Sequence, residues 1–314
     1  MLRWGILGPG NIAAKRVAPA MRAAGHDLAC IGSRSLTRAQ AFAANHGVRR
    51  ARGSYAEVLE ADDVDAVYVS LPNDVHEEWT IAALEAGKHV LCEKPLSLDA
   101  ASAGRMAASS AEHGRLLMEA GMWRFHPRTA ATFEVLRERR IGDLRLVHAA
   151  FAFRMRNAEN YRALLQHGGG ALLDIGYYGV TAARWFAGDE PDAVRAVQRR
   201  WPGGVDGTTF ALLSFPAGAT ASIQASFDSA RHEVVDLVGT DGTLRLPRTF
   251  TAHADFDAPL LVDGEPLATW RADPYREMVA AFADAVASGG PAPLPLDDSV
   301  ATAEVLDRIR TAAI

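Results

Sequence analysis

The chain has 314 residues, of which 49% are hydrophobic and 23% charged, and its formal net charge is -5. A chain of this length is longer than a typical domain with a single hydrophobic core, so we expect two domains. The negative charge provides no basic field for nucleic acid or anionic lipid, and no stretch approaches the 18 or so uninterrupted apolar residues of a membrane span. We therefore expect neither a nucleic-acid nor a membrane partner.

The opening residues and the two cysteines bear on the compartment. The run MLRWGILGPG enters a strand-like segment without the basic and long apolar regions of a signal peptide. Cys30 and Cys92 each lie among apolar residues at the end of a predicted strand, where packing explains them better than chemistry. We expect a cytoplasmic protein.

The first 121 residues alternate strands and helices. Apolar runs predict strands at residues 2–7, 28–34, 65–72, 89–95 and 115–121. Segments of helical composition separate them, and Ser97 is expected to cap the helix over 97–113. Such βαβ units predict an α/β domain over residues 1–121, with the doubly wound parallel sheet of the Rossmann type.

After about residue 122 the pattern changes. Helices are predicted over 127–140 and from Gly170, and the runs that predict strands are residues 146–153, 193–201, 207–215, 220–227, 233–239 and 242–247. Short turns separate most of these runs, so residues 122–314 are expected to form an α+β domain with a largely antiparallel open sheet. Two closing helices, over 273–290 and 299–313, are free to pack back on the first domain.

The turn after the first strand reads GPGNIA at residues 8–13, which is the GxGxxA form of a dinucleotide fingerprint. Gly8 permits a tight turn, and Gly10 lets the backbone approach a pyrophosphate. The following helix start, with Asn11 and Ile12, offers amide donors to phosphate. These four residues are predicted cofactor contacts, with an ordinary glycine turn as the alternative.

The end of the second strand bears on the type of dinucleotide. An NAD enzyme places an acidic residue there to bind the ribose 2′-hydroxyl. Here the chain reads GSRSLTR at residues 32–38, and Ser33, Arg34 and Arg38 offer a hydroxyl and two guanidiniums, which pair well with phosphate. NADP is favoured over NAD, although the arginines could also be solvated charges at a helix start.

Two further segments carry reactive groups. CEKPL at residues 92–96 places Lys94 at the C-terminal end of a strand, where a doubly wound sheet borders its ligand, and the proline fixes the backbone there, with a cis bond as one option. Read in isolation, it is equally consistent with a strand-ending turn. In the helix from Gly170, Asp174 and Tyr178 stand four residues apart and share one face. A carboxylate beside a phenol is typical of a proton-transfer site.

Together, GPGNIA, YVSLPNDVHEEWTIAALEAGKHVLCEKPL, WRFHP and GGGALLDIGYYGV resemble the Gfo/Idh/MocA family over essentially the whole chain. WRFHP and Asp-Ile-Gly-x-Tyr look most like the subgroup of glucose-fructose oxidoreductases, dimeric dihydrodiol dehydrogenases, NADP-linked xylose dehydrogenases and deoxysugar 3-ketoreductases. Tyr178 stands where many inositol-type relatives carry histidine. That difference argues against an inositol dehydrogenase.

The resemblance implies roles for individual residues. Lys94 matches the family's catalytic lysine and Tyr178 its last catalytic position. The loop and corner that the family places at the nicotinamide end of the cofactor correspond here to Leu71, Pro72, Asn73, His76, Glu93 and Lys94. The family also implies a homodimer or homotetramer formed through the C-terminal sheet.

We expect an NAD(P)-dependent oxidoreductase that transfers hydride between nicotinamide and a hydroxyl or carbonyl of an aldose, oxo-sugar or related polyol. Tyr178 would be the acid or base, Lys94 would lower its pKa and hold the substrate oxygen, and Asp174 would orient substrate hydroxyls or the lysine. The substrate is expected between the domains, and its predicted contacts are Arg124, Asn157, Tyr161 and Asp174.

Three alternatives remain open. The substrate could be a trans-dihydrodiol or a nucleotide-linked sugar, because specificity depends on side-chain placement that the sequence does not fix. The chain could also be a non-catalytic NADP-binding regulator, although it retains both the lysine and the tyrosine. No spacing of His, Cys and carboxylate residues predicts a metal site.

Overall fold

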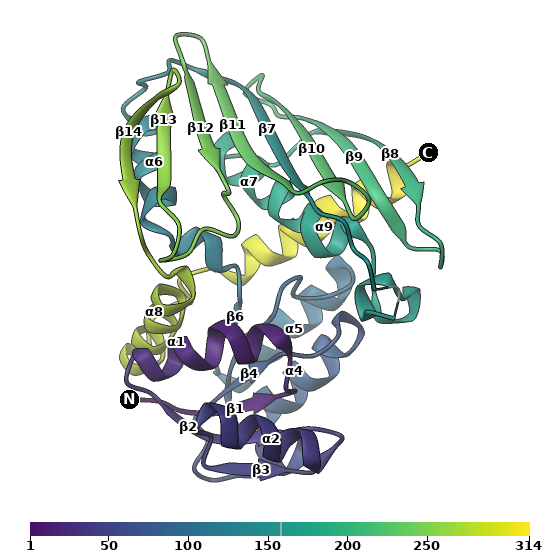
Figure 1. Cartoon of the computed structure of the whole chain (residues 1–314), viewed down its shortest axis with the longest axis vertical. Helices are drawn as coiled ribbons and strands as arrows, with labels where there is room; N and C mark the ends of the chain where they lie inside the picture. The colour runs from purple at the N-terminus through teal and green to yellow at the C-terminus, as the bar shows by residue number, and fades with distance from the viewer. Residues whose placement is uncertain (158) are drawn as a thin grey trace. The chain divides into compact units, whose positions relative to one another are not determined.

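The computed structural model describes residues 1–157 and 159–314, and the chain divides into two compact units (Figure 1). The first unit consists of Met1–Met122 and Tyr275–Val300. The second consists of Trp123–Pro274 and Ala301–Ile314. The first unit is thus assembled from two stretches that are far apart in the sequence.

Six parallel strands form the sheet of the first unit, in the order β3-β2-β1-β4-β5-β6. They are β1 (Arg3–Leu7), β2 (Asp27–Gly32), β3 (Arg50–Arg52), β4 (Ala66–Val69), β5 (His89–Cys92) and β6 (Leu117–Glu119). This is the strand order of the doubly wound dinucleotide fold. Every residue of β4 is buried, as expected for a central parallel strand. The predicted parallel sheet is confirmed.

Helices connect these strands. They are η1 (Ala13–Val17), which continues into α1 (Ala18–Ala23), then α2 (Leu36–His46), α3 (Ala56–Leu59), η2 (Asn73–Val75), α4 (His76–Glu85) and α5 (Ala100–His113). The later stretch adds α8 (Pro274–Ser288). Its Phe282 packs 5.2 Å from Trp4 of β1, ring centre to ring centre, and neither side chain is exposed. The later stretch therefore completes the core of the first unit.

Two short elements of the first unit were not predicted, and one predicted cap was wrong. The strand β3 is a charged triplet without an apolar pattern, and α3 spans a single helical turn. Asp99 rather than Ser97 caps α5, because its carboxylate accepts a hydrogen bond from the Ser102 amide at 2.8 Å. Ser97 lies too far before the first helical residue and donates instead to the Asp99 carbonyl at 2.6 Å.

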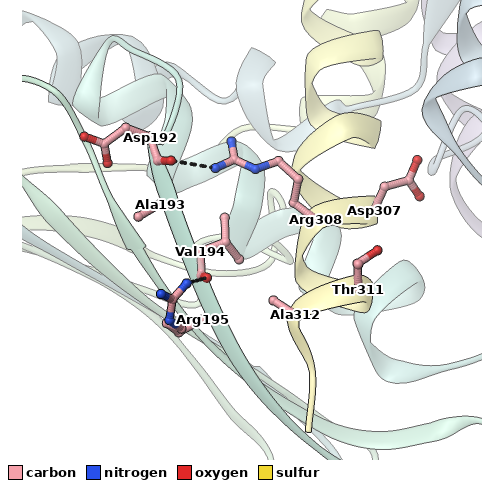
Figure 2. A pocket seen from close by; sticks show the side chains of 8 residues that line it. All are labelled: Asp192, Ala193, Val194, Arg195, Asp307, Arg308, Thr311 and Ala312. Atoms are coloured by element: carbon pink, nitrogen blue, oxygen red, sulfur yellow. Dashed lines mark hydrogen bonds between the residues drawn. The ribbon is translucent and has the colours of Figure 1, made fainter.

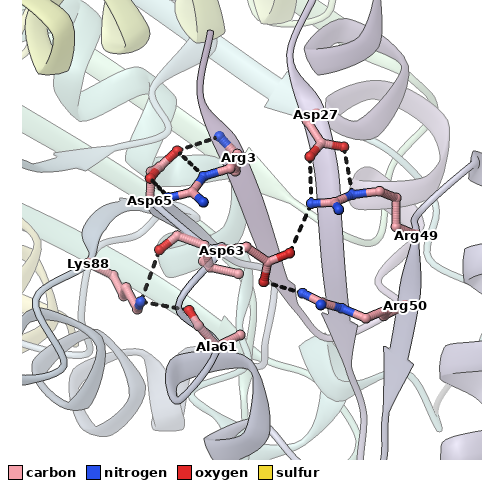
Figure 3. Close-up of polar contacts among 9 residues, drawn as sticks. Arg3, Asp27, Arg49, Arg50, Ala61, Asp63, Asp65 and Lys88 are labelled. Atoms are coloured by element: carbon pink, nitrogen blue, oxygen red, sulfur yellow. Dashed lines mark hydrogen bonds and ion pairs between the residues drawn. The ribbon is translucent and has the colours of Figure 1, made fainter.

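Charged side chains near the amino ends of the parallel strands pair with one another (Figure 3). Arg3 donates from Nε to Asp65 at 2.9 Å, and this hydrogen bond lowers the pKa of the Asp65 carboxyl. Arg49 bridges Asp27 and Asp63 at 2.7 and 3.0 Å. Because these partly exposed charges satisfy each other, we interpret the network as structural.

Eight strands form the sheet of the second unit, in the order β14-β13-β12-β11-β7-β10-β9-β8. They are β7 (Leu144–Ala152), β8 (Ala193–Arg200), β9 (Asp206–Ser214), β10 (Thr220–Ser226), β11 (His232–Gly239), β12 (Thr243–Pro247), β13 (Ala258–Val262) and β14 (Glu265–Trp270). Neighbours are antiparallel except β7 and β10. The largely antiparallel sheet is confirmed, although β13 and β14 were not predicted.

The helical segments of this unit leave one face of the sheet open. They are η3 (Met122–Phe125), α6 (Pro127–Arg137), η4 (Tyr161–Ala163), η5 (Leu165–His167), η6 (Leu172–Gly176), α7 (Tyr177–Ala187) and α9 (Leu296–Ala312). Figure 1 shows α6 and α7 against the same face. Residues of β9 alternate accordingly, with Ala211 and Leu213 buried and Phe210 and Leu212 exposed.

Both cysteines are free and have no exposed surface, which confirms the prediction of buried packing. Burial raises the pKa of the Cys30 and Cys92 thiols. Within the described residues, no helix combines the length and hydropathy needed to cross a bilayer.

Candidate active site

The GPGNIA turn joins β1 to a helix in the predicted way. Gly8 has a φ of +90°, and a side-chain carbon at this position would lie 2.6 Å from the Ser70 carbonyl oxygen. Only glycine fits at position 8, and a side-chain carbon on Gly10 would lie 2.4 Å from Ser70 Oγ, so the Ser70 side chain would have to move to admit one. The amide of Ala14 donates to the Gly10 carbonyl at 3.0 Å. The helix therefore begins directly at the loop, and its first amides have no partner within the helix.

The segment after β2 combines hydroxyls with exposed cations. Ser33 is buried, and its hydroxyl accepts a hydrogen bond from the Ser35 amide at 3.2 Å. Ser35 in turn caps α2 by accepting from the Arg38 amide at 3.4 Å. Arg34 and Arg38 are exposed. Two guanidiniums without an acidic neighbour in this segment suit a phosphate better than a ribose hydroxyl.

His76, a predicted cofactor contact, is enclosed by main chain. It has no exposed surface, and its ring nitrogens lie 2.9 Å from the Pro95 carbonyl oxygen and 3.0 Å from that of Leu71. Burial lowers the pKa of the ring. Each carbonyl belongs to a different predicted cofactor loop, so His76 packs between the two loops, and its neutral ring donates a hydrogen bond to one of the two carbonyls. Asn73, at the start of η2, is also buried.

The corner that carries Lys94 is held on both sides of its proline. The Lys94–Pro95 peptide is cis, which is one of the options left open by the sequence. The Lys94 amide donates to the Glu93 carboxylate at 3.3 Å, and the Leu96 amide donates to the buried carboxylate of Glu119 at 2.6 Å. Glu119 was not predicted, because it is distant in sequence and reaches the corner only through the pairing of β5 with β6.

In the second unit, Asp174 and Tyr178 lie on one continuous helical segment made of η6 and α7, which confirms the predicted helix. Both residues are 8% exposed. The turn that contains Asp174 is a π-helix, a wider turn that often occurs at functional sites.

Asp174 is held by an arginine that the sequence did not reveal. Arg162 Nε lies 2.9 Å from Asp174 Oδ2, and the two side chains are 27% and 11% exposed. The Arg162 guanidinium also lies over the ring of Tyr161, 4.6 Å from its centre. A charge-assisted hydrogen bond of this kind fixes the orientation of the carboxylate. It also brings Tyr161, a predicted substrate contact, into the same cluster.

The loop between Arg162 and Asp174 is closed by Asp206. The Gly170 amide donates to the Arg162 carbonyl at 2.9 Å, and Asp206 accepts from the Leu172 amide at 2.7 Å. Burial raises the pKa of Asp206 to about 6. Gly170 has a φ of +127°, and a side-chain carbon there would lie 2.0 Å from Asp206 Oδ1, so a glycine is required.

Aromatic rings enclose Tyr178. Phe250 stacks on it with ring centres 5.1 Å apart, Phe151 lies 5.7 Å away, and Tyr177 meets it edge-on at 5.4 Å. Rings packed on several sides fix the direction of the phenol. Tyr178 is therefore a fixed side chain in an apolar surrounding.

Arg124 and Asn157 are the other two predicted substrate contacts. The Arg124 guanidinium lies 3.6 Å over the centre of the Trp185 ring. Asn157 is exposed, and its side-chain oxygen accepts from the Glu159 amide at 2.9 Å. The contacts of Arg124 and Asn157 with substrate stay predictions.

A hollow of about 460 Å³ lies between the start of β8 and the end of α9 (Figure 2). Its lining consists of Asp192, Ala193, Val194, Arg195, Asp307, Arg308, Thr311 and Ala312. Arg308 spans part of it by donating to the carbonyls of Pro191 and Asp192 at 2.5 and 3.0 Å. None of the predicted site residues lines this hollow. Across the described part of the chain, no group of three or more metal-binding side chains occurs.

Comparison with known proteins places this architecture in a family. Residues 2–120 match a model described as "Oxidoreductase family, NAD-binding Rossmann fold", and residues 129–245 match the GFO/IDH/MocA C-terminal domain. The chain belongs to the Gfo/Idh/MocA family. The family predicted from the sequence motifs is confirmed, and the protein is an oxidoreductase.

Individual Gfo/Idh/MocA members resemble the chain over most or all of its length. A D-xylose 1-dehydrogenase (NADP(+)) of Haloferax volcanii is 37% identical over 99% of this chain and 97% of its own. A trans-1,2-dihydrobenzene-1,2-diol dehydrogenase of Sus scrofa is 35% identical over 78% of this chain and 74% of its own. A solved structure of a 3-ketoreductase from Actinomadura kijaniata, in complex with TDP-benzene and NADP, has a TM-score of 0.91 at 36% identity and covers 99% of this chain and 98% of its own. These relatives belong to the predicted subgroup.

Proposed function

We propose that the protein is an NADP-dependent oxidoreductase that acts on a hydroxyl or carbonyl group of a sugar-like substrate. The observation that carries the proposal is the fixed pair on one helical segment: Asp174 bound to Arg162, and Tyr178 enclosed by aromatic rings. Two relatives support the substrate class, because one is named a D-xylose 1-dehydrogenase and the other a 3-reductase of a dTDP-linked didehydro sugar.

The residues present fit a dinucleotide. Gly8 admits no side chain and Gly10 stands close against Ser70, and the absence of a side chain at both positions leaves the start of the helix open to a pyrophosphate. Ser33, Arg34 and Arg38 would hold a ribose 2′-phosphate. When bound, the nicotinamide supplies or accepts the hydride. The remaining proposed contacts are Asn11, Ile12, Leu71, Pro72, Asn73, Glu93 and Lys94, while His76 would act through the loops that it joins.

Tyr178 would handle the proton. Reduction of a carbonyl leaves negative charge on its oxygen, and a phenol within reach can deliver a proton as that charge develops. A phenol has a pKa of about 10, so it needs a nearby cation to stabilise its anionic form, and we assign that role to Lys94. Asp174, fixed by Arg162, would orient substrate hydroxyls. The reverse reaction uses the same groups in the opposite order.

Removing either proposed catalytic group tests this assignment. Tyr178→Phe and Lys94→Ala should each lower kcat by on the order of a hundredfold to ten-thousandfold, which is the usual loss with a general acid. Tyr177→Phe is the matched control, because it removes a hydroxyl from the adjacent buried ring. Steady-state rates with a confirmed substrate are the measurement. Survival of both variants within about tenfold of the wild-type rate would mean that the assignment is wrong.

A substrate panel separates the alternatives. Aldoses, oxo-sugars, inositols, trans-dihydrodiols and a nucleotide-linked sugar, each with NADP(H) and NAD(H), can be followed by the absorbance of reduced nicotinamide. Turnover of a dihydrodiol or of the nucleotide-linked sugar alone would select one of the two neighbouring activities. Binding of NADPH without turnover of any panel member would favour a non-catalytic regulator.

We propose a homodimer or homotetramer assembled through the open face of the second unit's sheet. The support is a group of exposed apolar side chains on that face, namely Leu146, Val197, Phe210 and Leu212. We also propose the cytoplasm as the compartment, since both cysteines are free thiols.

A further inference from the structure

A single phenol interrupts the apolar strand β4. Tyr68 stands between Val67 and Val69 and has no exposed surface. A buried hydroxyl is costly unless it forms a hydrogen bond, and that of Tyr68 donates to Glu93 Oε1 at the end of the neighbouring strand β5. Phenylalanine would fill the same space, so the hydroxyl itself needs an explanation.

The phenol can only be a donor in this position. Burial, followed by the effect of the Glu93 carboxylate, raises the pKa of Tyr68 well above its usual value. It therefore keeps its proton throughout the neutral range and does not exchange protons with a substrate.

Tyr68 lies close to both loops assigned to the cofactor. Ser70, two residues further along the chain, stands against the dinucleotide loop, because its Oγ lies 2.4 Å from the place where a side-chain carbon on Gly10 would stand. On the other side, Glu93 Oε2 accepts from the Lys94 amide at 3.3 Å. Tyr68 thus stands two residues before the neighbour of Gly10 and donates to the carboxylate that accepts from the Lys94 amide.

We infer that Tyr68 is a positioning residue for the reaction, whose hydroxyl fixes Glu93 and so keeps the Lys94 corner in register with the dinucleotide loop. This inference rests on the proposed function, in which Glu93 and Lys94 contact the cofactor. Tyr68 itself touches neither cofactor nor substrate and acts through Glu93.

Tyr68→Phe is the direct test, because it keeps the ring and removes the hydroxyl. We expect the Kd for NADPH, measured by nicotinamide fluorescence, to rise about tenfold, which corresponds to one lost hydrogen bond to a charged group. The kcat should fall while the KM for the sugar stays within about twofold, because the substrate contacts are untouched. Tyr55→Phe is the control, since this tyrosine of the first unit packs edge-on against Trp79.

A double-mutant cycle with Glu93→Gln shows whether Tyr68 acts through Glu93. We expect the combined variant to bind NADPH no more weakly than Glu93→Gln alone, because the second change removes a bond that the first has already disturbed. Additive losses would overturn the inference, and so would a Tyr68→Phe protein whose Kd and kcat both match those of the control. Should Tyr68→Phe fail to fold, Tyr68→Leu and Tyr68→Gln replace it, since only glutamine keeps a group that can donate to Glu93: a Kd raised more by leucine than by glutamine supports the inference, and equal Kd values overturn it.

The two proposals fail in different ways. Wild-type protein that binds NADPH but turns over no panel member contradicts the proposed activity, while the Kd comparison still decides the role of Tyr68. Wild-type protein that does not bind NADPH contradicts both.

Discussion

Arg162 narrows what Asp174 can do. A buried carboxylate whose oxygen is 2.9 Å from a guanidinium nitrogen is an oriented hydrogen-bond acceptor. That setting suits the alignment of hydroxyl groups better than the delivery of protons. It supports our proposal that Tyr178, with its enclosed ring, is the residue of this helix that handles the proton.

Arg162→Met should therefore lower kcat/KM for the confirmed substrate. We expect a loss of about tenfold to a hundredfold, which corresponds to one hydrogen bond between charged groups. Arg162→Lys should fall between wild type and Arg162→Met, because an ammonium keeps the charge but cannot reproduce the geometry of Nε.

Arg154→Met provides the control for this series, since Arg154 is an exposed arginine of the same stretch. Steady-state kinetics are the measurement. An Arg162→Met enzyme as active as the control would show that Asp174 does not depend on its arginine.

The sequence could predict residues whose motif is local, and it missed those defined by a distant partner. Lys94 was found because it follows a strand, and Asp174 and Tyr178 because they repeat at helical spacing. Arg162 reaches Asp174 only after the intervening loop has closed. Tyr68 reaches Glu93 only when β4 and β5 pair side by side. Register between strands and closure of loops are not encoded in the spacing of neighbouring residues.

At the scale of elements, the start of the helical segment that carries Asp174 and Tyr178 is held by a residue of another strand. Asp206, the first residue of β9, accepts hydrogen bonds from the Leu172 amide and from the Thr209 hydroxyl, at 2.7 and 2.8 Å. It therefore fulfils for η6 the role that a local cap fulfils for α2 and α5. The helix that carries Asp174 is thereby tied to the sheet beneath it.

Asp206 should give the protein a stability that depends on pH. Its folded-state pKa is raised to about 6, so the folded protein binds this proton more tightly than the unfolded chain, where an aspartate titrates near 3.9. The stabilisation is fully present below the unfolded value and is lost as the pH rises through about 6. Asp206→Asn keeps an oxygen acceptor but cannot titrate.

Urea unfolding of wild type and Asp206→Asn at several pH values tests this linkage. The unfolding free energy of the variant, relative to wild type, should increase between about pH 4 and pH 6.5 and then remain constant. Using the difference removes the contribution of other carboxyls that titrate in both proteins. A difference that does not change with pH would show that Asp206 has an ordinary pKa.

Elements with a repeating apolar pattern were predicted, and those that depend on their neighbours were not. The core strands of the first sheet have buried apolar runs, and β8 and β9 alternate between exposed and buried residues. By contrast, β3 is Arg50–Arg52, an edge strand that exists because its backbone pairs with β2. Its side chains carry no signal of that pairing.

At the scale of the whole molecule, the open face of the larger sheet is the proposed interface between copies of the chain. Phe210 and Leu212 are 39% and 53% exposed on β9. Introducing charge there, as in Leu212→Glu, should convert the proposed oligomer into monomers, because an interface core cannot bury an unpaired carboxylate at low cost. Light scattering after size-exclusion chromatography measures the mass.

Leu36→Glu serves as the control for this experiment, since it changes a similarly exposed leucine of the first unit. We expect it to keep the wild-type mass. A Leu212→Glu protein that also keeps the wild-type mass would contradict assembly through this face.

The two-part construction of the first unit also has a consequence for the order of events during synthesis. Trp4 leaves the ribosome long before Phe282, whose ring packs against it and is made only after every strand of the second unit. Domains generally fold as units while the chain emerges. The strands of the second unit can therefore pair first, while the first unit remains incomplete until Tyr275–Val300 has been made, and Ala301–Ile314 then completes the second unit.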